Sequence, residues 1–135
     1  METLDLTSFE NAVKSLADVI NVYDSDRLNA YMRDSMIQRF EYTYSLSLKM
    51  IKRYFAKSAF EKENIEGMTF NEMVRTANRM GLLKTDLETW DNFRQKRNMT
   101  SHTYNENFAK DVVAIIPAFK DEAEFLLNKV KEKLS

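Results

Sequence analysis

The chain has 135 residues, and its 20 Lys and Arg nearly balance 21 Asp and Glu, so the net charge of −1 favours no class of partner. It has no cysteine, which excludes disulfides, thiolate metal sites and cysteine nucleophiles and favours the cytoplasm. No apolar run approaches the roughly 20 residues that cross a bilayer, so we expect no membrane partner. Two Gly and one Pro leave little material for tight turns, so we predict one domain over residues 1–135 built from long helices.

The first half of the chain predicts two helices. Thr7-Ser8-Phe9-Glu10 is a capping box, which we expect to begin a helix that runs to about Val22. A turn at Asp24-Ser25-Asp26 precedes a longer apolar pattern, which predicts a helix over residues 27–58, roughly 45 Å long. Two buried faces are expected on this helix, one for the core and one for a neighbouring helix or a second chain. The second face would use apolar residues that lie off the main stripe: Ile37, Tyr42, Leu46 and Met50.

The second half predicts three more helices. Thr69-Phe70-Asn71-Glu72 is a capping box and opens a short helix that ends at Gly81. Thr85-Asp86-Leu87-Glu88 is another, and opens a helix that carries the segment from Arg94 to Tyr104. Apolar residues from Phe108 to Leu134 predict a last long helix. The sequence therefore predicts an all-α, antiparallel up-and-down four-helix bundle with an additional short helix.

The segment from Arg94 to Tyr104 concentrates the polar chemistry of the chain and holds its single histidine, His102. If the segment is helical, Asn98 and His102 share one face. The adjoining row would consist of Arg97, Ser101 and Tyr104. An imidazole exchanges a proton near neutral pH, and a guanidinium can hold two non-bridging phosphate oxygens. This combination suits RNA, which supplies its own 2′-OH nucleophile, so we expect no metal and no other cofactor.

A single histidine per chain also bears on the number of chains. Cleavage of a phosphodiester needs a base and an acid, and two chains related by a two-fold axis would bring two imidazoles together. The residues therefore predict a homodimer with the site across its interface. The alternative is that His102 only caps a helix end or interacts with the helix dipole, and that Arg97 lies on a solvated face.

Two motifs of this chain resemble those of a known family. The segment from Arg97 to Tyr104 resembles the Arg-x-x-x-x-His-x-Tyr signature of HEPN domains. The segment from Ile37 to Lys49 resembles the second-helix motif of one HEPN branch, the nucleotidyltransferase substrate-binding proteins. The resemblance covers nearly the whole chain, and it implies a helical bundle that dimerises with the signature at the interface.

The resemblance also implies a function and site residues. It implies a minimal nucleotidyltransferase, encoded nearby, as the partner in a toxin–antitoxin pair. Arg97 and His102 would be the catalytic residues of a metal-independent RNase, with Asn98 as a polar helper. Tyr104 would be the residue to which the nucleotidyltransferase adds AMP.

An alternative reading of the same branch is a non-catalytic subunit that binds substrate for the nucleotidyltransferase. The motif Gln38-Arg39-Phe40-Glu41 differs from other HEPN toxins and keeps this alternative open. We expect Gln38, Arg39, Glu41 and Ser101 to line the cleft or to bind the partner enzyme, with exposed charge on a long helix as the simpler interpretation. A basic run offers contacts to RNA phosphates, although it also suits a solvated helix face: Lys49, Lys52, Arg53 and Lys57.

Overall fold

The structure, a computed structural model, describes residues 4–58 and 60–134, and these residues contain helices and turns without a β-strand. The all-α class is therefore confirmed. No helix within the described residues is both long and apolar enough to cross a membrane. The helices are α1 (Thr7–Ser25), α2 (Ala30–Lys57), α3 (Lys62–Glu66), α4 (Phe70–Arg79), α5 (Leu87–Asn98) and α6 (Glu106–Leu134), and a 3₁₀ turn covers Thr100–His102.

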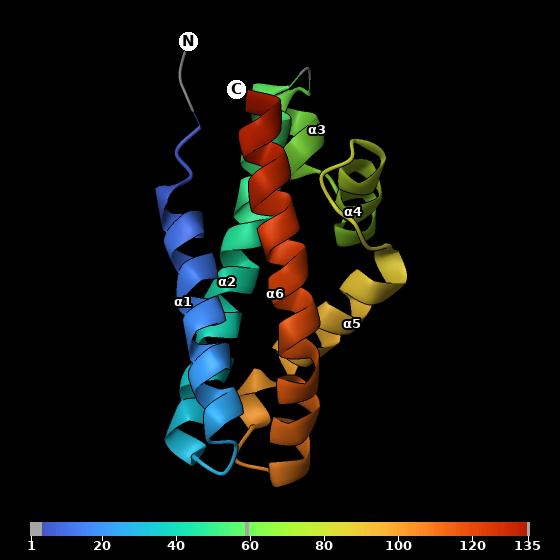
Figure 1. The fold of residues 1–135 in the computed structure, drawn as a ribbon. Helices are drawn as coiled ribbons and strands as arrows, with labels where there is room; N and C mark the ends of the chain where they lie inside the picture. The colour runs from blue at the N-terminus through green and yellow to red at the C-terminus, as the bar shows by residue number, and fades with distance from the viewer. Residues whose placement is uncertain (1–3, 59, 135) are drawn as a thin grey trace.

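Three long helices, α1, α2 and α6, pack side by side and form most of the bundle (Figure 1). The chain runs down α1, up α2, down again through α4 and α5, and up α6, which is the predicted up-and-down order (Figure 1). The third pass is therefore divided between two helices, and α5 lies inclined across the lower part of α6 (Figure 1). α5 contacts α2 as well as α6.

The core is centred on Phe119 of α6, whose ring contacts aromatic rings from α2 and α5. Phe40 and Tyr44 of α2 lie with their ring centroids 5.1 and 6.0 Å from it. Trp90 and Phe93 of α5 lie at 6.0 and 5.2 Å, edge to face. Such pairs contribute about 0.5–1.5 kcal/mol each beyond the burial of their surface. The aromatic cluster therefore fixes α5, a short helix, against the two long ones.

Tyr44 belongs to this aromatic cluster, and its environment changes its acidity. Burial raises the pKa of Tyr44 to about 12, although the positive charges of Arg94 and Arg97 oppose this rise. Between the ordinary value of 10.0 and about 12, the folded chain keeps a proton that the unfolded chain has lost. The free energy of unfolding therefore falls as the pH rises through this window.

We expect Tyr44→Phe to make the fall in stability between about pH 10 and 12 less steep. Urea denaturation at several pH values measures this slope. Tyr31→Phe is the matched control, because Tyr31 is 83% exposed and lies outside the cluster. Equal slopes for Tyr44→Phe and the unsubstituted chain would contradict the assigned pKa.

The beginnings of α1 and α2 differ from the prediction. The capping box at Thr7 is wrong: Thr7 lies inside α1, and its N–H donates to Asp5 Oδ1 at 2.9 Å. α2 begins at Ala30, because the Asn29 side chain accepts the N–H groups of the next turn. Leu28, which the prediction placed inside this helix, is 97% exposed. Local side-chain acceptors therefore decided both boundaries.

The caps of α4 follow the prediction, whereas the cap of α5 lies one residue later. Thr69 Oγ1 accepts the Glu72 N–H at 3.1 Å, and Gly81 after the helix has a φ of 78°. In α5 the capping residue is Asp86, whose carboxylate accepts the Thr89 N–H at 3.0 Å. The single turn α3 is an addition to the predicted elements, and its one buried residue gives too weak an apolar pattern to predict.

A buried carboxylate on α6 holds the loop between α4 and α5. Glu122 is 0% exposed, and its two oxygens accept the backbone N–H groups of Lys84 and Thr85, each at 2.9 Å. The Thr85 hydroxyl also donates to this carboxylate, which explains why Thr85 is not the cap of α5. Glu122 therefore fixes the start of α5, while the aromatic cluster fixes its body.

Candidate functional site

The segment from Arg94 to Tyr104 does not remain one α-helix. α5 ends at Asn98, and the Thr100–His102 turn has 3₁₀ geometry, with the His102 N–H donating to Met99 O at 2.9 Å. The Thr100 hydroxyl donates to Arg97 O at 2.8 Å, so a side chain takes up an acceptor near the end of the helix.

A 3₁₀ turn has about three residues per turn, so the rows expected from a continuous helix are not kept. Asn98 is the last residue of α5 and His102 the last of the 3₁₀ turn, and the side chains of both are exposed. Ser101 and Tyr104 are exposed as well, whereas Arg97 is half-buried. The predicted site residues thus come from one segment but do not form the two helical rows that were expected.

Arg97 of this segment has a side chain that is held by a hydrogen bond. Its Nη1 donates to Thr100 Oγ1 at 3.2 Å, and Thr100 is only 6% exposed. The guanidinium therefore has one N–H group bound internally and others available for a ligand.

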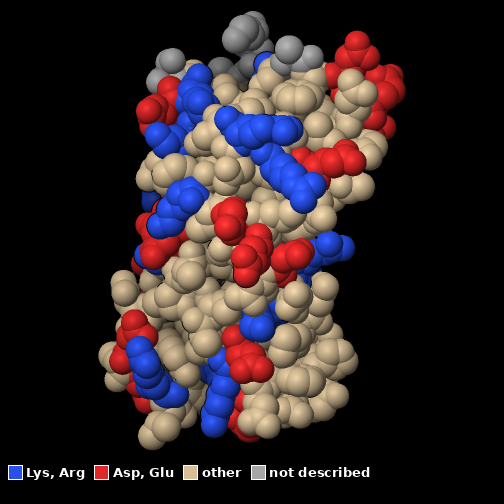
Figure 2. Space-filling view, turned by 90° about the vertical axis from the view of Figure 1, so that its right-hand side faces the viewer, with Lys and Arg blue, Asp and Glu red and all other residues tan. Residues whose placement is uncertain are grey.

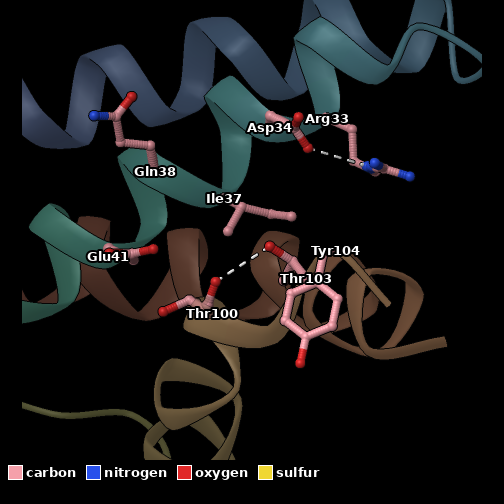
Figure 3. Close-up of a pocket in the computed structure, with 8 residues that line it drawn as sticks. All are labelled: Arg33, Asp34, Ile37, Gln38, Glu41, Thr100, Thr103 and Tyr104. Carbon is pink, nitrogen blue, oxygen red and sulfur yellow. Dashed lines mark hydrogen bonds and ion pairs between the residues drawn. The ribbon is translucent and has the colours of Figure 1, made fainter. Parts of the chain in front are cut away.

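Two neighbouring grooves follow α2 opposite this segment, and they share Gln38 and Glu41. The first, here called the Tyr104 groove, has a volume of about 360 Å³ and is shown in Figure 3. It is lined by Arg33, Asp34, Ile37, Gln38, Glu41, Thr100, Thr103 and Tyr104. The second, here called the Arg97 groove, has a volume of about 440 Å³. It is lined by Gln38, Glu41, Tyr42, Ser45, Leu46, Lys49 and Arg97.

His102 lies beside these grooves and lines neither of them. Its ring is exposed and contacts Tyr104 and Phe108, with centroids 6.1 and 6.3 Å apart. Within the described residues the imidazole makes no hydrogen bond, so it does not cap a helix through its side chain. Both ring nitrogens are therefore open to a ligand.

The residues of the motif Gln38-Arg39-Phe40-Glu41 lie on different sides of α2. Gln38 and Glu41 line both grooves, whereas Arg39 lines neither. Arg39 Nη1 instead donates to Ser15 O of α1 at 2.8 Å, because the next position on a helix is rotated by about 100°. Arg39 therefore joins two helices of the bundle.

Arg33 is a groove residue that the sequence analysis missed. Its Nη1 contacts Glu106 Oε2 of α6 at 2.9 Å, and its Nε contacts Asp34 Oδ1 at 3.3 Å. Although burial alone opposes the charged form, the bonds to Glu106 and Asp34 raise the pKa of Arg33. Its main partner is 73 residues away, so no local pattern in the sequence indicates this contact.

The lining of the Arg97 groove carries more positive than negative charge. The face that contains α3, α4 and α5, in contrast, exposes many side chains of both signs (Figure 2). The lining of the Arg97 groove contains two cations, Lys49 and Arg97, and one carboxylate, Glu41. An anionic ligand with hydrogen-bonding groups therefore fits the lining of this groove.

Known proteins resemble this chain over nearly all of its length. The family described as nucleotidyltransferase substrate binding protein like matches residues 4–132. A Haemophilus influenzae protein named probable ribonuclease HepT is 34% identical over 140 aligned residues, which cover 98% of this chain and 95% of that protein.

Solved structures agree with the fold. One from Haemophilus influenzae, described as revealing the fold of a substrate binding domain of a nucleotidyltransferase, has a TM-score of 0.86 and 34% identity, covering 94% of this chain and 99% of that one. Another, from Thermus thermophilus, has a TM-score of 0.67 and 30% identity, covering 88% and 98%. The bundle described above is therefore shared by both structures.

Proposed function

Because this chain belongs to the nucleotidyltransferase substrate binding protein-like family, we propose that it is the HEPN-type partner of a minimal nucleotidyltransferase and cleaves RNA without a metal. In this proposal it is the toxin of a toxin–antitoxin pair. One observation carries the proposal: a guanidinium held at a groove, Arg97, and an exposed imidazole, His102, lie on one segment. The relative named probable ribonuclease supports RNA as the substrate.

The proposed reaction is an attack of the RNA 2′-OH on the adjacent phosphorus. One imidazole takes the proton of the 2′-OH, and an acid gives a proton to the departing 5′ oxygen. Arg97 stabilises the additional negative charge of the pentacoordinate phosphorus, and Asn98 supplies a further polar contact. The products are a 2′,3′-cyclic phosphate and a 5′-hydroxyl.

The proposal includes a homodimer, because each chain supplies a single imidazole. The exposure of His102 supports this arrangement, since its ring can meet a second chain without a change in the bundle. The exposed aromatic residues around it, Tyr104 and Phe108, would supply apolar surface to the same contact. A monomer in sedimentation analysis at the concentrations used for activity would contradict a site formed across an interface.

The test is cleavage of RNA by the purified dimer in EDTA. We expect the same rate in EDTA as in Mg²⁺, with a cyclic phosphate at the new 3′ end. The intact mass is measured in parallel, to establish that Tyr104 is unmodified. Absence of cleavage by unmodified protein, or cleavage only with Mg²⁺, would contradict the RNase proposal.

The second candidate is a non-catalytic subunit that binds substrate for the nucleotidyltransferase. The description of the related Haemophilus influenzae structure as a substrate binding domain favours it. This candidate predicts a stable complex with the nucleotidyltransferase and changed transferase kinetics, without RNA turnover by the free dimer.

We expect the nucleotidyltransferase to add AMP to Tyr104, whose side chain is 84% exposed and therefore accessible to an enzyme. Incubation with the partner and ATP should add the mass of one AMP per chain, and Tyr104→Phe should abolish the addition. Tyr31→Phe is the control, because Tyr31 is equally exposed at 83% but lies outside the signature. An adduct on Tyr104→Phe, or none on the unsubstituted chain, would contradict this prediction.

A further inference from the structure

The Arg97 groove contains polar residues that the proposed cleavage does not use. Four of them follow one another on α2 at steps of four, three and four, and so share one face: Gln38, Tyr42, Ser45 and Lys49. The fifth, Glu41, lies next to Tyr42 and lines the same groove. From first to last they span roughly 16 Å of helix. The groove has about 440 Å³, within the range of roughly 300–1,000 Å³ usual for small-ligand sites. This face therefore has the size and polarity of a binding site.

Tyr42 gives this face a fixed aromatic ring. Its hydroxyl is hydrogen-bonded to Ser15 Oγ of α1 at 2.8 Å, and the residue is still 39% exposed. A ring whose far end is bound to the neighbouring helix has little freedom to turn away. An exposed aromatic ring in a groove that also contains cations can serve as a stacking platform for a base of single-stranded RNA.

Gln38 and Glu41 bring free hydrogen-bonding groups to the same place. Within the described residues, the Glu41 carboxylate has no ion pair, and the Gln38 amide makes no hydrogen bond. A carboxylate only accepts hydrogen bonds, whereas an amide both donates and accepts. The pair can therefore read the edge of a base, and the carboxylate favours bases with an exocyclic amino group.

Lys49 lies one turn beyond Ser45 on the same face and is exposed. Arg97 borders the groove from the opposite side, with its guanidinium fixed by Thr100. A phosphate between these two cations would be bound from both sides, and Leu46 supplies the apolar surface beneath a sugar or a base.

We propose that the Arg97 groove is a base-reading nucleotide subsite, which binds the nucleotide next to the cleaved bond. The base stacks on Tyr42, its edge is read by Gln38 and Glu41, and its phosphate lies between Lys49 and Arg97. The subsite prefers adenine or cytosine to uracil, because uracil has no amino group for Glu41. This inference rests on the proposed function for its substrate, RNA, but it is tested by binding alone.

The experiment uses hexamers of A, C or U with 2′-O-methyl sugars, which have no free nucleophile and are not cleaved. Fluorescence anisotropy with the unsubstituted dimer should show A and C bound at least about 5-fold more tightly than U. Tyr42→Ala should weaken all three by about 5- to 100-fold, and Tyr42→Phe, which keeps the ring but loses its bond to Ser15, should weaken them less. Tyr31→Ala is the matched control and should leave binding unchanged.

Two further variants test recognition of the base and binding of the phosphate separately. Glu41→Gln should reduce the preference for A and C over U without a comparable loss of affinity for U. Lys49→Ala should lower the slope of log K against log salt by about 0.7, the value for one phosphate contact on a single strand. Lys62→Ala, in α3 and outside the lining of the groove, should leave that slope unchanged.

The outcomes distinguish this subsite from the RNase proposal. The subsite would be overturned, even if RNA is cleaved, by either of two results. One is that the hexamers do not bind; the other is that the Tyr42, Glu41 and Lys49 variants bind them with unchanged affinity and the same preference among A, C and U. The expected losses of binding without any cleavage by the unsubstituted dimer would support the subsite and contradict the RNase. AMP and CMP bound as tightly as the hexamers, with the same losses, would identify free nucleotide as the occupant.

Discussion

His102→Ala should reduce the rate of RNA cleavage in EDTA by about 100- to 10,000-fold, the usual contribution of one general acid or base. His102 is the single histidine of the chain, and its exposed imidazole has both nitrogens open to a ligand. No other residue of the segment exchanges a proton readily at neutral pH. Initial rates on a labelled RNA measure the effect.

The same substitution should leave the fold unchanged, because the side chain is exposed and, in the part of the chain that the structure describes, its ring contacts are those with Tyr104 and Phe108. The free energy of unfolding should therefore change by no more than about 0.5 kcal/mol. Asn107→Ala, an exposed neighbour on α6, is the control for activity. If His102→Ala cleaves RNA as the unsubstituted chain does, the chemistry lies elsewhere.

Glu122→Ala should lower the free energy of unfolding by about 3 kcal/mol. The substitution removes a fully buried carboxylate and leaves the N–H groups of Lys84 and Thr85 without their acceptor. Glu122→Gln should lower the free energy of unfolding by less, because the amide oxygen can still accept one of the two backbone N–H groups. Some loss should remain, because the amide N–H₂ is itself a donor and faces the other N–H group. Urea denaturation followed by the fluorescence of the single Trp, Trp90, measures both.

Glu124→Ala is the matched control for Glu122. Glu124 lies on the same helix, 44% of its side chain is exposed, and it forms a surface ion pair with Lys120 at 2.8 Å. Loss of such a pair changes the free energy of unfolding by about 0–1 kcal/mol. Equal stabilities of the Glu122→Ala and Glu124→Ala chains would show that the buried carboxylate does not hold the loop.

Most of the fold could be predicted, because its long helices carry apolar residues at regular steps. The α6 pattern, for example, predicts the buried positions of Phe119 and Leu126. The cap at Thr69 was predicted because its partner lies three residues away. The predicted cap at Thr85 was wrong, because the Thr85 hydroxyl donates to Glu122, 37 residues later, and Asp86 caps α5 instead. Capping rules based on neighbouring residues failed where a residue far along the chain, Glu122, bound the hydroxyl of the predicted cap.

In the candidate site, too, the residue types could be predicted from the sequence, whereas the local geometry could not. The sequence identified the segment of Arg97 and His102 by residue type, but it assumed a continuous helix there. The Thr100 hydroxyl, bound to the carbonyl and guanidinium of Arg97, accompanies the change to a 3₁₀ turn. Whether such a hydroxyl bonds to the backbone or to solvent depends on burial, which the sequence does not reveal. Arg39 was grouped with Glu41 for a similar reason, since the orientation of α2 against α1 sets which residues face a groove.

The contact between the rings of His102 and Tyr104 has a consequence for how AMP on Tyr104 would act. With the centroids 6.1 Å apart, a phosphodiester on the Tyr104 hydroxyl would bring a negative charge and an adenine into the neighbourhood of the imidazole. The anion would repel the phosphates of an approaching strand, and the adenine would occupy the space beside the ring. Silencing would then be electrostatic and steric at once, and it would require no movement of the helices.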